Sequence, residues 1–245
     1  WYHIHIETSS TFVESDQIVN INGSPITMSH VGTSQSPTAS GTGSFAVVGN
    51  AISGLLKGDK EGDAVDINSD GEWLISGAWK ASTSTIYHSG QVRTFQFIGG
   101  KWNQIGTVLE GDLKNESFGY DVGISDMSPI QSSTQKYPRI IVSAKNWDSN
   151  KGRVKVFFWD INGVGTSDGN WVQLGSSFQG TAVNEYVGES VSISKDGTTI
   201  AIGRSTETTI HTWNGQYGAS GGWTQKGTTF THGAGTSVSL TNDGS

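Results

Sequence analysis

The stretch Gly188-Glu-Ser-Val-Ser-Ile-Ser-Lys-Asp-Gly-Thr-Thr-Ile-Ala-Ile-Gly203 decides the fold class of this chain. Val191 and Ile193 alternate with polar residues, which is typical of a half-buried β-strand. Asp196-Gly197 then predicts a tight turn, because Gly adopts positive φ at little steric cost and Asp can bond its own backbone. An apolar run follows the turn directly. The stretch therefore predicts a β-hairpin.

The same pattern recurs along the chain as Gly-x-x-Val-x-(Ile/Leu)-(Asn/Ser/Thr), with Asp close behind it. The copies begin at Gly62, Gly119, Gly188 and Gly235, so successive starts are 57, 69 and 47 residues apart. Once loop insertions are allowed, these spacings bracket those of common propeller repeats, which are roughly 40–50 residues long. The sequence therefore predicts a repeat architecture.

Each copy is followed by further strand signals. Second strands are predicted over 73–77, 140–144 and 200–203, and third strands over 90–97, 152–158 and 209–213. A Trp-x-Gln-x-Gly motif then marks a short fourth strand at Trp102, Trp171 and Trp223. Each unit is thus a four-stranded antiparallel meander with small aliphatic inner strands and aromatic outer strands. This grading suits the wedge-shaped blade of a β-propeller, which must stack on neighbouring blades to bury its faces.

The predicted fold is therefore all-β: a β-propeller of about 4–5 blades, as a single domain or fragment over 1–245. Its approximate repeats are 13–56, 62–111, 119–180 and 188–232, with 235–245 plus 1–8 as a partial or closing blade. The first repeat is a degraded copy. Its expected segments are a first hairpin at 17–23, a second strand at 25–28, a third at 43–49, and 52–54 in place of Trp-x-Gln-x-Gly. The strand Trp1–Ile6 is expected to pair with Ser237–Leu240 and close a ring.

Composition narrows the function classes. A net charge of −7 argues against nucleic acid as a partner, since phosphate binding needs clustered Lys and Arg. The chain has no Cys, which excludes disulfides and thiolate metal sites. No apolar run approaches the length of a membrane span. The 9 Trp and 9 Phe supply the core material that disordered chains lack.

On these motifs the chain resembles the FG-GAP repeat family, which includes the integrin α-subunit propellers, and in particular a bacterial, algal or viral branch with SxDG…WxQxG units. Phe118-Gly119 is a literal Phe-Gly start, and Gly77-Ala78 matches the Gly-Ala, although Trp79 replaces the usual Pro. The resemblance covers 60–245 well and the first fifth poorly. It implies a full ring of seven blades, placement outside the cell, and adhesion or ligand binding through loops at one face.

Calcium is the candidate ion. Asp66, Asn68 and Asp70 match the start of a Ca²⁺ loop, with oxygen ligands at alternate positions and Gly71 at the bend. A further acidic ligand expected near Leu74 is missing. The alternative interpretation is an Asp-Gly hairpin turn that binds no ion.

The tryptophans divide into two groups. The repeated Trp102, Trp171 and Trp223 favour packing between blades over sugar stacking. Trp79, Tyr87 and Trp147 break the repeat in loops, which makes them the better candidates for a sugar or protein ligand.

The main functional hypothesis is a non-enzymatic module outside the cell, on a cell surface or on a virion. It would bind a protein or a glycan, or associate with itself into a fibre or shell. Loops 81–89, 128–137 and 162–170 would be displayed at a rim. The rivals are a lectin-like propeller with one sugar per blade junction, and a propeller-scaffold hydrolase with carboxylates converging from Asp66, Asp121 and Glu189.

Overall fold

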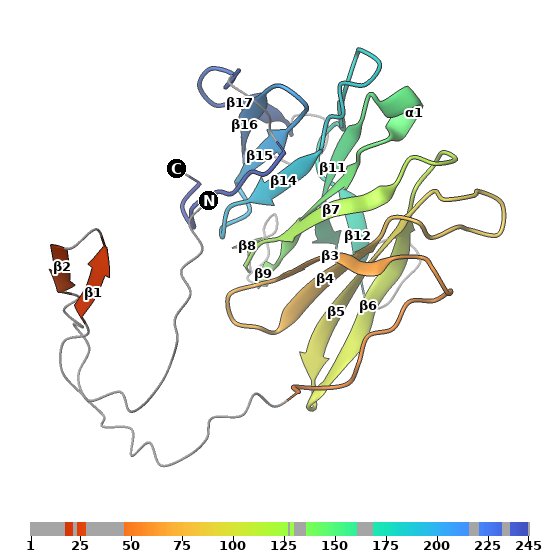
Figure 1. The fold of residues 1–245 in the computed structure, drawn as a ribbon. Helices are drawn as coiled ribbons and strands as arrows, with labels where there is room; N and C mark the ends of the chain where they lie inside the picture. The colour runs from red at the N-terminus through yellow and green to blue at the C-terminus, as the bar shows by residue number, and fades with distance from the viewer. Residues whose placement is uncertain are drawn as a thin grey trace. The chain divides into compact units, whose positions relative to one another are not determined.

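The computed structural model describes strands at 18–21 and 24–27 and then residues 47–126, 128–129, 136–160, 169–215, 221–231 and 236–244 (Figure 1). The chain divides into two compact units, Trp1–Ala46 and Val47–Ser245, and each is described by itself. In the first unit, β1 (Ile18–Ile21) pairs antiparallel with β2 (Ser24–Thr27). This hairpin lies where the degraded first repeat predicts one. The predicted closing strand Trp1–Ile6 and the motif residue Gly235 lie outside the described residues.

The second unit is built from three sheets, each with four antiparallel strands in sequence order. The first sheet contains β3 (Glu61–Ile67), β4 (Trp73–Ala78), β5 (Gln91–Ile98) and β6 (Lys101–Glu110). The second contains β7 (Phe118–Ile124), β10 (Arg139–Ala144), β11 (Arg153–Asp160) and β12 (Asn170–Gln173), with β13 (Phe178–Gln179) also paired to β11. The third contains β14 (Ser190–Ile193), β15 (Thr199–Gly203), β16 (Thr208–Trp213) and β17 (Trp223–Gln225). The sheets thus cover residues 61–110, 118–179 and 190–225. The corresponding repeats were predicted at 62–111, 119–180 and 188–232.

The all-β class and the four-stranded antiparallel sheets are confirmed. The described residues contain one short helical turn, α1 (Trp147–Asn150), and a small hairpin of β8 (Ser128–Pro129) with β9 (Lys136–Tyr137). No sheet among them closes into a barrel. Strand β6 is longer than the predicted 102–106, because it continues past Gly106 through a register shift opposite β5 and pairs again at Val92.

The three sheets stack face to face, and the middle sheet is covered on both sides (Figure 1). The side chains of β10 alternate: Ile140 and Val142 enter the core shared with the first sheet, and Ile141 enters the core shared with the third. All three are fully buried. This two-sided burial explains why the inner strands are aliphatic on both faces, as expected for a sheet between two neighbours.

Two of the three repeated tryptophans, Trp171 and Trp223, lie between sheets. Trp171 is only 5% exposed, and its Nε1 donates to Thr94 Oγ1 of the first sheet at 2.8 Å. Trp223 Nε1 donates to the carbonyl of Leu174 in the second sheet at 3.0 Å. A Cβ on Gly106 would lie 2.8 Å from Trp159, so this Gly, at φ +74°, allows the tryptophans of the next sheet to approach.

The same contact corrects one assignment in the first repeat. A Cβ on Gly49 would lie 2.9 Å from Trp102, so Gly49 has the place that Gly106 has one unit later. The sequence interpretation gave that place to 52–54. The described residues 47–56 form no strand.

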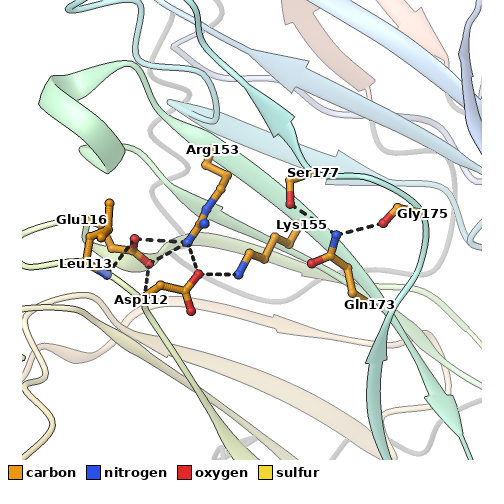
Figure 2. Close-up of polar contacts among 8 residues, drawn as sticks. All are labelled: Asp112, Leu113, Glu116, Arg153, Lys155, Gln173, Gly175 and Ser177. Carbon is orange, nitrogen blue, oxygen red and sulfur yellow. Dashed lines mark hydrogen bonds and ion pairs between the residues drawn. The ribbon is translucent and has the colours of Figure 1, made fainter.

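A second repeated set of polar contacts joins the first and second units just before the motif Gly (Figure 2). Glu116 is fully buried, accepts hydrogen bonds from the backbone N–H groups of Asp112 and Leu113, and pairs with Arg153. Asp112 also pairs with Arg153 at 2.7 Å and with Lys155 at 2.9 Å. An acidic residue occupies the position of Glu116 in three units. It lies three residues before the motif Gly and five residues after another Gly, and its three copies are Asp59, Glu116 and Glu185. This spacing is a sequence signal present in three copies, and it was not among those used to predict the repeats.

Candidate functional site

The first strands of successive units lie side by side, and side chains of one strand hold the backbone of the next. Asp66 of β3 accepts from the N–H of Ile124 in β7, and Asp121 of β7 accepts from the N–H of Val191 in β14, both at 2.8 Å. The hydroxyls of Ser190 and Ser192 in β14 accept from Val238 and Leu240, both at 3.1 Å. Since β7 and β14 are the outermost strands of their sheets, the N–H groups of Ile124 and Val191 have no backbone partner in a further strand of the same sheet, and an unmet donor there is costly.

At the turn end of these strands, the residues that follow the motif make a second line of contacts. Ser69 donates from its backbone N–H to Asp126 Oδ1 at 2.8 Å, Asp126 N–H donates to the carbonyl of Lys195, and Lys195 N–H donates to the carbonyl of Asn242. A small pocket of about 170 Å³ lies here, lined by these four residues and by the apolar residues Ile67, Ile124, Ile193 and Leu240. We call it the turn pocket. Its polar groups hold neighbouring units together.

The predicted calcium ligands belong to this end. Asn68 is buried, and its Oδ1 accepts from the N–H groups of Glu72 and Trp73. Asp70 Oδ1 also accepts from the N–H of Glu72. Both carboxylate oxygens of Asp66 accept hydrogen bonds from backbone N–H groups, one of them from Ile124. These are the contacts that a hairpin turn makes without an ion. In the part of the chain that the structure describes, no group of three or more His, Cys, Asp or Glu side chains could hold a metal ion. Calcium at Asp66, Asn68 and Asp70 stays a prediction.

The opposite end of the first strands carries a larger open pocket of about 580 Å³, which we call the Trp79 pocket. Besides Trp79, which follows β4, its lining residues come from all four copies of the motif: Asp63, Ala64, Val65, Tyr120, Asp121, Glu189, Ser190 and Thr236. In each copy, the residue directly after the motif Gly faces this pocket, and these residues are Asp63, Tyr120, Glu189 and Thr236. One repeated backbone therefore presents four different side chains at one place.

Aromatic rings form one part of this pocket. Trp79 follows β4, and its Nε1 donates to Asp63 Oδ2 at 2.9 Å. The rings of Trp79 and Tyr120 meet edge to face, with centroids 6.2 Å apart. Lys80 Nζ lies 4.8 Å from the centroid of Trp79. The indole is thus held by three neighbours and lines the pocket with a partly exposed ring.

Lys145 holds the polar part of the Trp79 pocket in place. Its Nζ pairs with Glu189 at 2.7 Å, donates to the Tyr120 hydroxyl at 3.1 Å, and lies over the rings of both Tyr120 and Tyr186. Partial burial by itself lowers the pKa of Lys145, but the hydrogen bonds to Glu189 and Tyr120 outweigh it and raise the pKa. The lysine is therefore charged, and it fixes both Glu189 and Tyr120.

Burial raises the pKa of Asp121 at the floor of this pocket, although the N–H of Val191 and the hydroxyl of Ser190 counteract this effect. Desolvation likewise raises the pKa of Asp66. Both carboxyls are engaged with backbone N–H groups of the next unit. Their shifted pKa values follow from their places between units.

The structure separates the predicted ligand residues. Trp79 lines the pocket, but Tyr87 stacks on His88 at 3.7 Å and is 57% exposed beside Lys114. Trp147 packs against the core under Arg153, whose Cζ lies 5.1 Å from the ring centroid. Neither Tyr87 nor Trp147 is among the residues that line the Trp79 pocket.

The predicted single rim of loops is also separated. In an antiparallel meander, connections alternate between the two ends of a sheet. The loop 81–89 joins β4 to β5, whereas the strand pairs β7–β10 and β11–β12, which flank the other two expected loops, are consecutive at the opposite end of a meander; residues 130–135 and 162–168 of those loops lie outside the described residues. Of these loops, only 81–89 begins beside the Trp79 pocket.

Sequence reasoning missed Tyr120, Lys145 and the pocket role of Glu189. A signal was available, because the position after the motif Gly varies as Asp, Tyr, Glu and Thr between neighbours that repeat. A variable position on a constant frame is where specificity is expected.

Comparison of the chain with protein-family models finds no match, and comparison with curated protein sequences finds none either. The resemblance to FG-GAP repeats therefore stays a prediction. Among the described residues, no helix has the length and apolar character needed to span a membrane.

Proposed function

We propose that this chain is a non-catalytic binding module, built as a β-propeller or part of one, which binds its ligand at the Trp79 pocket. The propeller is supported by the order of the units. Three first strands, β3, β7 and β14, follow one another side by side, and the segment 236–240 follows the third; each is bonded to the next in the same sense by side chains such as Asp66, Asp121 and Ser190. This is how blades follow one another around an axis.

The observation that carries the function is the shared origin of the pocket residues. The frame repeats, and the four residues after the motif Gly differ in charge, size and aromaticity. Packing alone does not require such variety at a solvent-facing position. A rigid frame with a variable, concave, partly aromatic patch suits recognition.

The carboxylates support binding over hydrolysis. A glycosidase needs two carboxyl groups free to act on the bond between them. Here Asp121 is bonded to backbone N–H groups, and Glu189 is paired with Lys145. Asp66 lines the turn pocket, at the other end of the strands.

A lectin-like propeller with one sugar at each blade junction is less well supported. The indole N–H groups of Trp171 and Trp223 already donate hydrogen bonds across those junctions. We place the module outside the cell or on a cell or virion surface, following the family resemblance. A protein partner, a glycan and self-association are all compatible with a display role.

A selection experiment tests the proposal. The wild-type protein and a Tyr120→Ala variant would be screened on a glycan array and against a phage-displayed peptide library. Ligands that bind the wild type and lose binding to the variant would support the Trp79 pocket. If no ligand is found, or if every ligand binds the variant equally well, the pocket is not the binding site and the proposal fails.

A further inference from the structure

We infer that the Trp79 pocket takes an uncharged carbohydrate. This inference rests on the proposed function and names the ligand class for the same pocket. It is carried by three features: two aromatic rings, a lining rich in hydrogen-bond acceptors, and carboxylates of which two, Asp63 and Glu189, are each paired with a lysine.

The rings provide the apolar part. Trp79 and Tyr120 are half-buried, meet edge to face at 6.2 Å and both line the pocket. Neither ring is fully buried, and the indole N–H of Trp79 already donates a hydrogen bond to Asp63. The indole therefore offers its ring surface, and not its donor, to a ligand. The C–H faces of a pyranose ring suit such a surface, because an aromatic side chain packs well against apolar groups while polar atoms remain wet.

The polar lining matches hydroxyl groups. Asp63 uses Oδ2 for Trp79, but its side chain is 45% exposed, so the carboxylate can accept further bonds. Thr236 is exposed at the rim and can donate or accept. Glu189 adds carboxylate oxygens that are fixed by Lys145. Sugar hydroxyls are donors and acceptors at once, so a mixed lining of carboxylates and hydroxyls suits them.

The charge balance selects against ions. Asp63 lies 3.8 Å from Lys60, and Glu189 lies 2.7 Å from Lys145, so a cationic ligand would have to compete with resident lysines. An anionic ligand would meet carboxylates on the lining of a chain whose net charge is −7. An uncharged ligand meets neither penalty.

The size is also suitable. The pocket volume of about 580 Å³ lies within the range of small-molecule sites, about 300–1,000 Å³. The pocket is open on one side, which allows a short oligosaccharide chain to extend into solvent.

The test is a titration of tryptophan fluorescence and of heat with defined sugars. Neutral probes would be cellotriose, mannotriose, galactobiose and the trisaccharide of N-acetylglucosamine, and anionic probes would be sialyllactose and a heparin tetrasaccharide. We expect saturable binding of at least one neutral probe and none of the anionic probes. Trp79→Ala should weaken binding about tenfold or more, since that factor corresponds to the loss of one good aromatic contact.

Two further variants keep the result interpretable. Trp79→Phe retains a ring and should bind more strongly than Trp79→Ala, even if the alanine variant is less stable. Phe230→Ala removes an exposed aromatic ring that is not among the residues lining the pocket, and should bind like the wild type. Equal weakening by Phe230→Ala would assign the effect to a general loss of exposed aromatic surface and overturn the inference.

The outcomes separate this inference from the proposed function. Binding of only the anionic probes, or of only library peptides that are lost in Tyr120→Ala, would overturn the carbohydrate class while the binding module stands. Neutral sugar binding that is insensitive to both Trp79 variants would place the sugar elsewhere and overturn the site. The absence of any ligand in either experiment would overturn both proposals.

Discussion

The two ends of the first strands differ in how they use their polar groups. At the turn end, Asp66, Ser69 and Asp126 are bonded to backbone or side-chain groups of neighbouring units. At the other end, Asp63 and Thr236 are exposed, and Trp79 and Tyr120 are partly exposed. The same repeated strand thus stabilises the stack at one end and displays variable side chains at the other. Substitutions at the turn end should therefore change stability, and substitutions at the Trp79 end should change binding.

The largest expected effect concerns two isoleucines at the same motif position. Ile124 is 6% exposed between the first and second sheets, whereas Ile67 is 49% exposed. Ile124→Ala should lower the free energy of unfolding by about 2–4 kcal/mol, and Ile67→Ala by less than about 1 kcal/mol, because only the first leaves a cavity. Urea denaturation measures both. Equal costs would show that another segment covers Ile67 in solution.

The next effect concerns the bond from Asp66 to the next unit. Asp66→Ala leaves the N–H of Ile124 without its acceptor and should cost about 1–2 kcal/mol. Asp66→Ser copies Ser192, which makes the corresponding bond one junction further on, and should recover part of the loss. Thermal unfolding distinguishes the two variants. If the serine variant were no more stable than the alanine variant, the bond would not be the source of stability.

A smaller effect concerns pH. Since burial raises the pKa of Asp121 above its ordinary value of 3.8, the folded state favours the protonated carboxyl. The stability that this group contributes is therefore greatest at acid pH and is lost as the pH rises from about 4 through the raised pKa. Asp121→Ser, which copies Ser190, should remove this part of the pH dependence. Parallel urea titrations at several pH values measure it, and an unchanged slope would contradict the assignment.

The smallest expected effect on stability is at Trp79. Trp79→Phe keeps a ring against Tyr120 and loses only the bond to Asp63, so its free energy of unfolding should change by less than about 1 kcal/mol. Differential scanning calorimetry measures this change. A loss of several kcal/mol would show that Trp79 stabilises the fold, and would contradict its assignment to the binding end of the strands.

Much of the fold was predictable, because the hairpin motif and the Trp-x-Gln-x-Gly strand are local signals. The strands after Asp70-Gly71 and Asp196-Gly197 lie within a residue or two of their predicted bounds. The first repeat was harder, because its signals are weaker. Gly49 shows its role only through its contact with Trp102, more than 50 residues away in the sequence.

The site was less predictable than the fold. Trp79 stood out because it interrupts a repeat, but Tyr120 and Lys145 looked like ordinary residues of a strand and a loop. Their contact with Glu189 depends on the stacking of the second unit on the third, and a local pattern contains no information about that stacking. The polar residues of the Asp-Gly turn suggested an ion for a similar reason, since the sequence does not show that Asn68 already bonds to its own backbone.

One measurement tests the separation of the two ends most directly. The melting temperature and the affinity for the best neutral sugar would be determined for Asp66→Ala and Tyr120→Phe side by side. Asp66→Ala should lower the melting temperature and leave the affinity unchanged. Tyr120→Phe, which loses the hydroxyl that accepts from Lys145, should lower the affinity and leave the melting temperature nearly unchanged. If both variants lowered both quantities together, stability and binding would not be separated along the first strands, and the central claim would be contradicted.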